Sequence, residues 1–313
     1  MMNSSRPIAL LLALCVSMAC SSNDDDVQTV EEEAIDCTTV SSVFTISLTT
    51  DGCTVAIASD LNTTSQYDET INGNTRTITV NNIPEHLVGV FPNSGNPNTI
   101  AEQNKTFSMT SAPELASNTT SGQGWVGGVL FSGVTTEVYT AEFFVGTTGQ
   151  TNMAWNQTTL QTVRDLGLDC NNAHVQPTGS YHYHGLPNAY GSDLNIDGSQ
   201  MVKVGYAADG FPIYYKYFED HNGDIVVAEA SYELRAGDRG GDGISAPIGC
   251  YDGEYFQDYE YDVTSGDLDA CNGRTGPTPD VPTGEYYYVI TEDFPSMPLC
   301  FSGTPDDSFR LGM

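Results

Sequence analysis

Polar and apolar residues alternate along the chain soon after residue 40. The alternation runs from Val43 to Thr49, reaches the turn sequence Asp51-Gly52, and continues in a second short run. A two-residue period on both sides of an Asp-Gly turn is typical of a β-hairpin. A second turn sequence, Asn72-Gly73-Asn74, separates the next pair of runs. Residues 37–75 are therefore predicted to form an N-terminal β-hairpin region.

The rest of the chain combines strand-like runs with loops rich in turn residues. Residues 125–145 contain further strand-like segments, and residues 207–218 are apolar and aromatic enough for a buried strand. Residues 91–97 hold too many Gly, Pro and Asn for a regular element, whereas residues 158–166 are one of the few segments suited to a helix. The chain is predicted to be mainly β, with an antiparallel β-sandwich-like architecture, long ordered loops and few short helices.

Composition and charge narrow the class of partner. The chain has 313 residues, with 41 Asp and Glu against 10 Lys and Arg, which gives a net charge of -31. Such a chain repels polyanions and has few cations for phosphate contacts, which excludes nucleic acid as a partner. A hydrophobic fraction of 39%, with 17 Tyr and 12 Phe, is enough for a folded core.

The N-terminus has the features of an export signal. A basic residue precedes an apolar run that is shorter than the roughly 20 residues of a membrane-spanning helix. Ser17-Met18-Ala19-Cys20 resembles the lipobox of bacterial lipoproteins. The resemblance implies that residues 1–19 are a lipoprotein signal peptide and that Cys20 carries the lipid. An ordinary secreted protein, cut at the same place, is the alternative.

Residues 20–36 are acidic and contain no aromatic residue. Segments of like charge without core-forming residues stay extended and solvated, so this one is predicted to be a tether. Acidic residues just after a lipidated cysteine also resemble the surface-export signals of some gram-negative lipoproteins. We therefore expect an extracytoplasmic protein on the outer face of the outer membrane, held to that membrane by its lipid anchor only.

Six of the 8 cysteines remain after Cys15 leaves with the signal and Cys20 takes the lipid. An even number in an oxidising compartment predicts disulfides. No Cys-x-x-Cys pair is present, which argues against a thiolate zinc site or a redox dithiol. The expected pairs are Cys37–Cys53, whose members flank a short strand, turn and strand, followed by Cys170–Cys271 and Cys250–Cys300.

Three histidines carry the most suggestive chemistry. His182 and His184 are two residues apart in a strand-like segment, so both imidazoles project from one face. His174 precedes the Pro177-Thr178-Gly179 turn and can fold back toward them. Neutral imidazoles suit zinc or copper and are poor ligands for magnesium or calcium. The alternative is a polar strand face whose histidines hydrogen-bond to the backbone.

Two carboxylates and one acidic loop extend the list of candidate sites. Glu142 and Asp209 are expected near the histidines, where each could act as a base toward bound water, complete the metal shell or orient an imidazole. Asp193-x-Asn195-x-Asp197-Gly198 resembles the start of a calcium loop, but Val204 stands where an EF-hand has Glu. Calcium is the further ion that this loop could hold, although an Asp-Asn turn needs no ion.

Two stretches of the sequence resemble each other. Leu168-Asp169-Cys170 recurs as Leu268-Asp269-Ala270-Cys271, and the segment from Pro177 to His184 recurs as the segment from Pro282 to Val289. The two aromatic segments could be paired strands of one sheet, with a cysteine beside the entry to each. The alternative is a common turn that leads into an aromatic strand twice.

Several motifs together resemble the YHYH family of extracytoplasmic proteins. The motifs are Asn81-Asn82-Ile83-Pro84-Glu85-His86, the Phe91–Pro97 loop, Asn172-Ala173-His174, Tyr181-His182-Tyr183-His184, Asp209-Gly210-Phe211-Pro212, Gly266–Arg274 and Asp293-Phe294-Pro295. The resemblance implies a YHYH domain over residues 76–307, adds His86 as a fourth ligand or a supporting residue, and brings no established biochemical function. The family usually has a histidine where this chain has Tyr287, so a ligand from the second stretch is not expected.

Two functions remain open from the sequence. The first is a histidine-rich divalent metal site for zinc or copper on a surface lipoprotein, acting hydrolytically or oxidatively. The second is a noncatalytic surface module that binds glycan or protein through aromatic segments such as Tyr286-Tyr287-Tyr288 and residues 255–261, with structural histidines. Metal content distinguishes the two.

Overall fold

A computed structural model describes residues 35–312. The signal sequence, Cys20 and nearly all of the acidic segment lie outside the described residues, so the predictions for them stay predictions. No helix among residues 35–312 is both long and apolar enough to cross a membrane.

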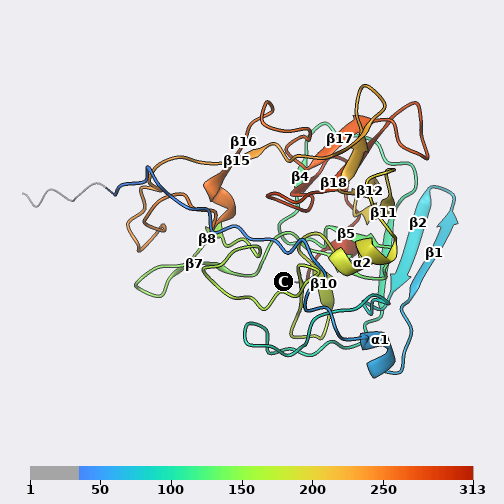
Figure 1. The fold of residues 1–313 in the computed structure, drawn as a ribbon, viewed down its shortest axis with the longest axis horizontal. Coiled ribbons are helices and arrows are strands. Elements are labelled where there is room, and N and C mark those ends of the chain that lie inside the picture. Colours follow the sequence, from blue (N-terminus) through green and yellow to red (C-terminus); the bar gives the residue numbers. More distant parts are fainter. Residues whose placement is uncertain (1–34, 313) are drawn as a thin grey trace, which may run out of the picture. The chain divides into compact units, whose positions relative to one another are not determined.

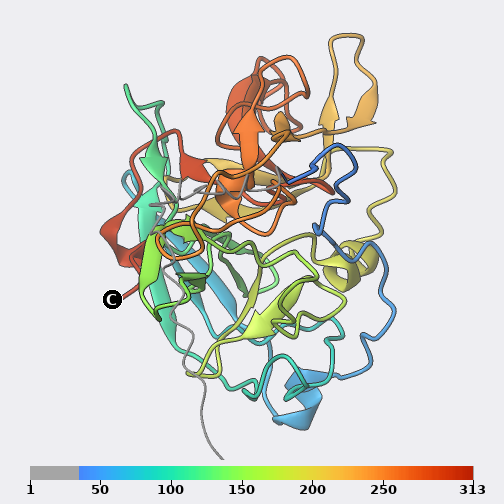
Figure 2. The same cartoon turned by 90° about the vertical axis from the view of Figure 1, so that its left-hand side faces the viewer.

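The described chain is built from short strands joined by long loops (Figures 1 and 2). The strands are β1 (Tyr67–Asn72), β2 (Thr75–Val80), β3 (Lys105–Thr110), β4 (Thr120–Ser121), β5 (Gly128–Leu130), β6 (Thr135–Thr136), β7 (Phe143–Val145), β8 (Thr151–Asn156), β9 (Ala173–Val175), β10 (Tyr181–Tyr183), β11 (Lys203–Ala207), β12 (Pro212–Tyr215), β13 (Tyr217–Glu219), β14 (Ile225–Val227), β15 (Tyr232–Leu234), β16 (Tyr259–Tyr261), β17 (Gly273–Gly276), β18 (Glu285–Ile290) and β19 (Cys300–Phe301). The helices are α1 (Ile57–Asp60) and α2 (Asn188–Asp193), with 3-10 turns at Phe256–Asp258 and Asp307–Phe309. The prediction of a mainly β fold with antiparallel sheets and few short helices is confirmed.

Of the two hairpins predicted near the N-terminus, the second forms. β1 and β2 pair across the Asn72-Gly73-Asn74 turn, and β2 pairs with β3 to complete a three-stranded antiparallel sheet. Alternate residues of β2 are buried, as a sheet with one covered face requires. Ile78 and Val80 pack with Phe107 of β3 in this part of the core.

The first predicted hairpin does not form, although the turn at Asp51-Gly52 does. Its two arms make only single bridges, and each bridge goes to a distant segment: Phe44 to Gln161, and Val55 to Val88. Residues 158–166, expected as a helix, are also irregular. Both predictions failed for the same reason. Local patterns predict pairing between segments that are close in the sequence, but here the backbone groups bond to distant segments.

The largest sheet has eight strands in the order β17-β18-β12-β11-β5-β6-β10-β9. Read from its centre outward, this order contains the same four-stranded unit twice: β5-β6-β10-β9 and β11-β12-β18-β17. Each unit has one parallel pairing, β6 with β10 and β12 with β18, between antiparallel ones. The central strands β5 and β11 pair antiparallel, with Val129 opposite Tyr206. A pseudo-two-fold axis therefore passes between these two residues.

The two units agree in register and in side-chain detail. His174 pairs with His182 in the first unit, and Arg274 pairs with Tyr287 in the second. Tyr181 Oη donates to Asp169 Oδ2 at 2.8 Å, and Tyr286 Oη donates to Asp269 Oδ2 at 2.9 Å. The similarity within the sequence is thus a structural repeat. The aromatic strands β10 and β18 share a sheet but are not paired, which corrects that expectation.

All six remaining cysteines form disulfides, as predicted, but every expected pairing is wrong. The bonds are Cys37–Cys250, Cys53–Cys170 and Cys271–Cys300. Cys37 and Cys53 were expected to pair across a hairpin, and no hairpin brings them together. Backbone contacts instead hold the segment after Cys37 beside residue 252, since Val43 N donates to Asp252 O at 2.8 Å.

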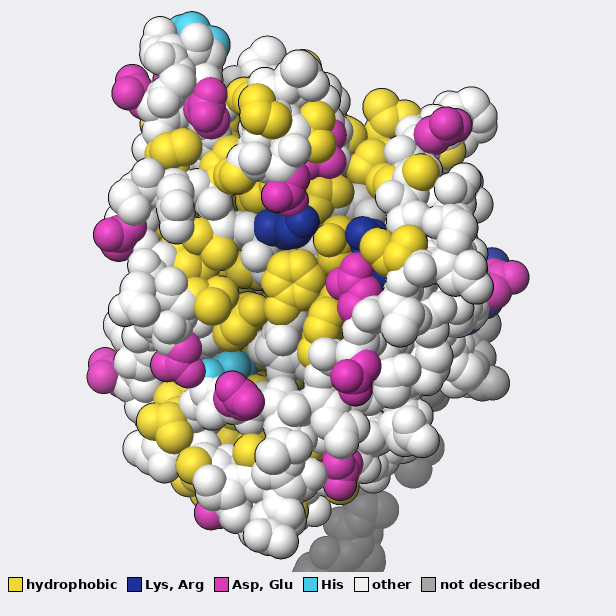
Figure 3. Space-filling model, turned by 90° about the vertical axis from the view of Figure 1, so that its right-hand side faces the viewer, with side chains coloured by type: hydrophobic (Ala, Val, Ile, Leu, Met, Phe, Trp, Pro, Cys, Tyr) yellow, Lys and Arg dark blue, Asp and Glu magenta, His cyan; other side chains and the backbone are white. Residues whose placement is uncertain are grey.

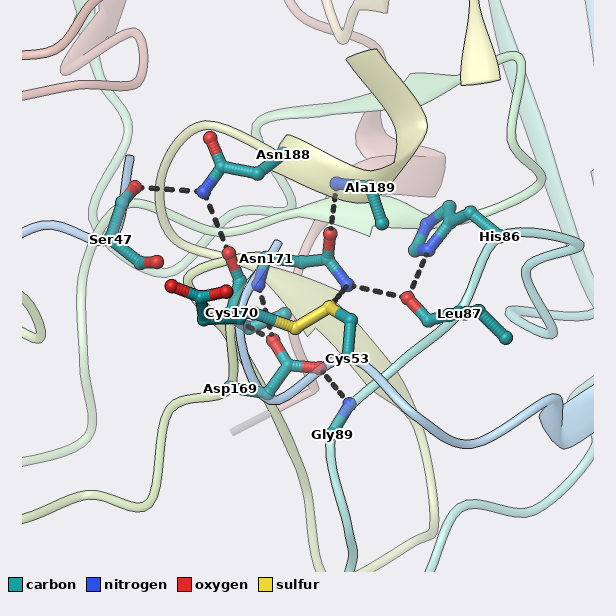
Figure 4. Close-up of a disulfide and its surroundings, with 12 residues drawn as sticks. Ser47, Cys53, His86, Leu87, Gly89, Asp169, Cys170, Asn171, Asn188 and Ala189 are labelled. Carbon is teal, nitrogen blue, oxygen red and sulfur yellow. Dashed lines mark hydrogen bonds between the residues drawn. A yellow bond between two sulfur atoms is a disulfide. The ribbon is translucent and has the colours of Figure 1, made fainter. Parts of the chain in front are cut away.

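The Cys53–Cys170 bond lies among hydrogen bonds that fix the chain just before β9 (Figure 4). Asn171 Nδ2 donates to Leu87 O at 3.0 Å, and Asn171 Oδ1 accepts from Ala189 N at 2.8 Å. Asp169 Oδ2 accepts from Gly89 N at 2.9 Å. The N-terminal segments and α2 are therefore tied to the short loop that leads into the first histidine.

The surface reflects the acidic composition. On the face drawn in Figure 3, acidic side chains are spread around a recessed apolar centre, and basic side chains are few.

Candidate metal centre

Three histidine side chains meet at the edge of the eight-stranded sheet. β9 and β10 are antiparallel neighbours, and His174 of β9 lies directly opposite His182 of β10. His184 follows β10 by one residue, and its backbone N donates to Asn172 O at 2.8 Å. Alternation along β10 places His182 and His184 on one face, as the spacing predicts. We call His174, His182 and His184 the histidine cluster.

The turn between β9 and β10 requires glycine at its last position. Gly179 has a φ of +87°, and a Cβ added there would lie 2.5 Å from the Cβ of Ala101. Gly179 N donates to Gln176 O, and Gln176 N donates to Ser180 O. The predicted Pro-Thr-Gly turn is therefore a tight connection that returns the chain in register.

The Nε2 atoms of the histidine cluster converge. His184 Nε2 lies 2.9 Å from His182 Nε2 and 3.1 Å from His174 Nε2. The candidate ligand atoms of the three residues all lie within 4.8 Å of one another. Two nitrogens bound to one ion at about 2.1 Å can be at most about 4.2 Å apart. Both measured Nε2 separations lie inside that limit.

The other ring nitrogens show which tautomer each histidine adopts. His174 Nδ1 lies 2.9 Å from Leu166 O, and His182 Nδ1 lies 3.2 Å from Ser180 O. A carbonyl oxygen can only accept, so both Nδ1 atoms carry hydrogen and both Nε2 atoms present lone pairs. His184 Nδ1 contacts Thr159 Oγ1, a hydroxyl that can donate or accept. One N–H on His184 could satisfy only one facing lone pair, whereas a bound cation satisfies all three.

Burial keeps the cluster neutral. His182 and His184 are each 2% exposed, and His174 is partly buried. Burial lowers the pKa of His174 and of His182 to about 4, and it lowers the pKa of His184 well below its ordinary value. Metal ligation requires unprotonated imidazole, and these side chains hold that form at neutral pH.

Glu137 is a carboxylate beside the cluster that sequence reasoning missed. It directly follows β6, and its Oε2 lies 4.0 Å from His182 Nε2. Both carboxylate oxygens accept from Gln176 Nε2 at 2.9 Å. Burial raises the pKa of Glu137 to about 7. The only local signal was its position after a β-branched run, and nothing in the sequence indicates the parallel pairing of β6 with β10.

A comparison with protein-family models finds a match that includes these residues. The model described as YHYH protein matches residues 106–303, more than half of the chain, and this range contains the whole histidine cluster. The chain belongs to the YHYH family. No curated protein and no solved structure gives a match.

The tyrosines of the YHYH motif point away from the cluster and hold the strand in place. Tyr181 Oη donates to Asp169, and Tyr183 Oη contacts His86 Nε2 at 2.6 Å and Ser132 Oγ at 2.9 Å. His86 therefore lies on the tyrosine face of β10. The expectation that His86 is a fourth ligand is wrong, because its Nε2 is occupied by Tyr183 and it is outside the group of candidate ligands.

The two carboxylates expected at the site of the YHYH domain lie elsewhere. Asp209 is buried in the second unit of the sheet, where its Oδ2 accepts from Tyr288 Oη at 2.6 Å and from Gly303 N at 2.8 Å. It cannot serve the cluster, and that expectation is wrong. Glu142 faces Arg164 at 3.8 Å, and its charge partly offsets the effect of burial on the pKa of His174. It is near the cluster but outside the group of candidate ligands.

Aromatic segments expected to bind glycan or protein are mostly in the core of the YHYH domain. Tyr286, Tyr287 and Tyr288 are 7%, 0% and 0% exposed, and Tyr255 and Tyr259 are also buried. Buried rings cannot contact a surface ligand. Of the tyrosines on which the binding-module interpretation was based, only Tyr261 is exposed, at 38%.

Two other groups of residues resemble ion-binding sites. Cys53 and Cys170 lie close to Asp169 in a metal-like arrangement, but the two sulfurs form a disulfide and are not free to bind an ion. In the acidic loop after α2, Asp197 Oδ1 accepts from Ser199 N at 2.9 Å, which is the turn that such a sequence forms without an ion. Calcium at that loop stays a prediction.

A small pocket lies beside His184. Its walls are mostly apolar and consist of Phe44, Val138, Thr158, Thr159, Leu160, Phe256, Phe294 and Pro295. The cluster is thus enclosed mainly by apolar side chains.

Proposed function

We propose that this YHYH domain binds one zinc or copper ion through His174, His182 and His184. The observation that carries the proposal is the convergence of three Nε2 atoms, two of them with Nδ1 tied to a backbone carbonyl. This is the arrangement in which a histidine is fixed as a metal ligand. Imidazole donors suit zinc and copper.

Three protein nitrogens leave a coordination position for water or substrate. A bound zinc ion lowers the pKa of such a water to about 7 and so supplies hydroxide for hydrolysis, whereas copper supplies oxidative chemistry. The chain contributes the fixed geometry, the neutral imidazoles and the apolar pocket that limits access of water. A metal-dependent hydrolytic or oxidative activity is the function that this geometry supports best.

Metal analysis of the purified protein tests the proposal. The protein, produced without an affinity tag and dialysed against metal-free buffer after exposure to zinc or copper, is expected to retain one ion per chain. Elemental mass spectrometry with a protein assay gives the ratio. A ratio near zero for both metals would mean that the three histidines are a structural hydrogen-bonded group, as in the alternative interpretation.

The location proposed for this function is the cell surface, with Cys20 lipidated and residues 20–36 as the tether. Three disulfides in the described chain support an extracellular setting. Cys20→Ser is expected to block lipidation and move the protein from the membrane fraction to the soluble fraction. A variant that fractionates with membranes as the parent does would rule out the anchor.

A further inference from the structure

Glu137 is a buried carboxylate without a cationic partner. Within residues 35–312 no Lys or Arg forms an ion pair with it; Lys105 acts on it electrostatically, but its Nζ donates to Ser180 Oγ at 2.9 Å. A buried carboxylate that lacks a positive partner is costly, and it is normally paired or bound to a metal. A cation bound beside Glu137 would offset this cost.

Glu137 also lies outside the group of ligand atoms that are all within 4.8 Å of one another, but it is close enough to His182 to share an ion with that residue. Its Oε2 lies 4.0 Å from His182 Nε2, and two ligand atoms at about 2.1 Å from one ion are at most about 4.2 Å apart. Gln176 is the residue after β9, and its amide holds both carboxylate oxygens. The same β9–β10 hairpin that positions the histidines thus orients the carboxylate.

The second unit of the sheet supplies an internal comparison. Thr136 pairs with Tyr183 in the first unit, and Ile213 pairs with Tyr288 in the second, so the next residue of each strand, Glu137 or Tyr214, occupies the same position. The register places Arg274, Tyr287 and Val289 where the first unit has its three histidines.

At all four of these positions the second unit has a different residue type from the first. In the second unit Tyr214 and Tyr287 pack with ring centroids 5.2 Å apart, and no carboxylate or imidazole remains at these positions. The tyrosine, aspartate and asparagine residues that hold the backbone are the same in both units. Glu137 therefore belongs with the histidines that bind metal and not with the residues that only maintain the fold.

From these observations we infer that Glu137 is the fourth, anionic ligand of the metal, an inference that rests on the proposed function. The donor set is then three imidazoles and one carboxylate. The carboxylate reduces the net charge of a buried divalent site from +2 to +1, which offsets the cost of burying both charges. Water or substrate then binds as a fifth ligand, as catalytic zinc sites allow.

Cobalt(II) is a suitable probe, since its visible absorption depends on the number and kind of its ligands. Glu137→Gln keeps the shape and removes the charge, and Glu142→Gln is the matched control, a nearby carboxylate that faces Arg164. Glu137→Gln is expected to weaken cobalt(II) binding at least about tenfold and to change the visible spectrum. Glu142→Gln should leave the spectrum unchanged and weaken binding less than Glu137→Gln does, since its charge acts on His174 only from a distance. Glu137→Asp should restore part of the affinity. Near-ultraviolet circular dichroism verifies the fold of each variant.

Two outcomes overturn the inference while leaving the proposed function intact. The first is a Glu137→Gln variant with the parent's affinity and spectrum. The second is a weaker affinity with the parent's spectrum, which would make Glu137 a positioning residue and not a ligand. If the parent binds no cobalt(II), zinc or copper, the proposed function itself fails, and this result is distinct from the other two.

Discussion

Replacement of both His182 and His184 by alanine is expected to abolish metal uptake. The double variant keeps one nitrogen of the cluster, His174 Nε2, which by itself is a weak ligand. If a protein zinc site contributes about 12 kcal/mol over four ligands, two ligands account for about 6 kcal/mol, or a loss of affinity on the order of ten-thousandfold. Elemental mass spectrometry after loading and dialysis should give a metal ratio near zero.

Controls separate loss of ligands from loss of fold. His221→Ala removes an exposed histidine in the loop between β13 and β14 and should leave the metal ratio unchanged. His182→Gln with His184→Gln keeps most of the buried volume, so it lowers metal uptake with less risk of a cavity. An alanine double variant that folds and still retains one ion per chain would show that the metal is elsewhere.

The histidine cluster could be predicted because its geometry is local. His182 and His184 are separated by the two-residue period of a strand, and His174 is one tight turn away. The β9–β10 pairing that this pattern predicts does form. The family motifs were less informative about ligands: they also brought in His86, which holds the fold through Tyr183.

Glu137 could not be predicted because its place depends on a nonlocal pairing. β6 and β10 are parallel neighbours although they are far apart in the sequence, and parallel strands need long connections that no short pattern encodes. Glu142 was expected instead because it lies in a strand-like aromatic run. The two carboxylates are only five positions apart in the sequence, yet Glu137 is buried beside His182 and Glu142 faces Arg164.

The predictions of the disulfide pairing and of the first hairpin failed for the same reason. Local alternation around Asp51-Gly52 suggested a closed pair of strands with a cysteine at each end. The two cysteines instead bond to partners 213 and 117 residues away. The repeat, by contrast, was visible in sequence because both units need the same Asp–Tyr and Asn contacts at the same register.

Removal of the Cys53–Cys170 disulfide is expected to lower the stability of the protein strongly. In Cys53→Ala with Cys170→Ala, the unfolded chain is freed from a crosslink that spans 117 residues. The loop-entropy relation gives a loss of about 5 kcal/mol in the free energy of unfolding for a loop of this length. Denaturant unfolding, followed by tyrosine and tryptophan fluorescence, measures the change.

The second unit of the sheet offers a matched control for this disulfide. Cys271 follows Asp269 much as Cys170 follows Asp169, but Cys271–Cys300 spans only 29 residues, so its removal should cost about 3.5 kcal/mol. The two variants should also differ at the metal centre. The loop held by Cys170 leads directly into His174, so we expect weaker metal binding in Cys53→Ala with Cys170→Ala than in Cys271→Ala with Cys300→Ala. Equal metal affinity in two folded variants would contradict this coupling, and equal losses of stability would show that loop length does not set the contribution of these bonds.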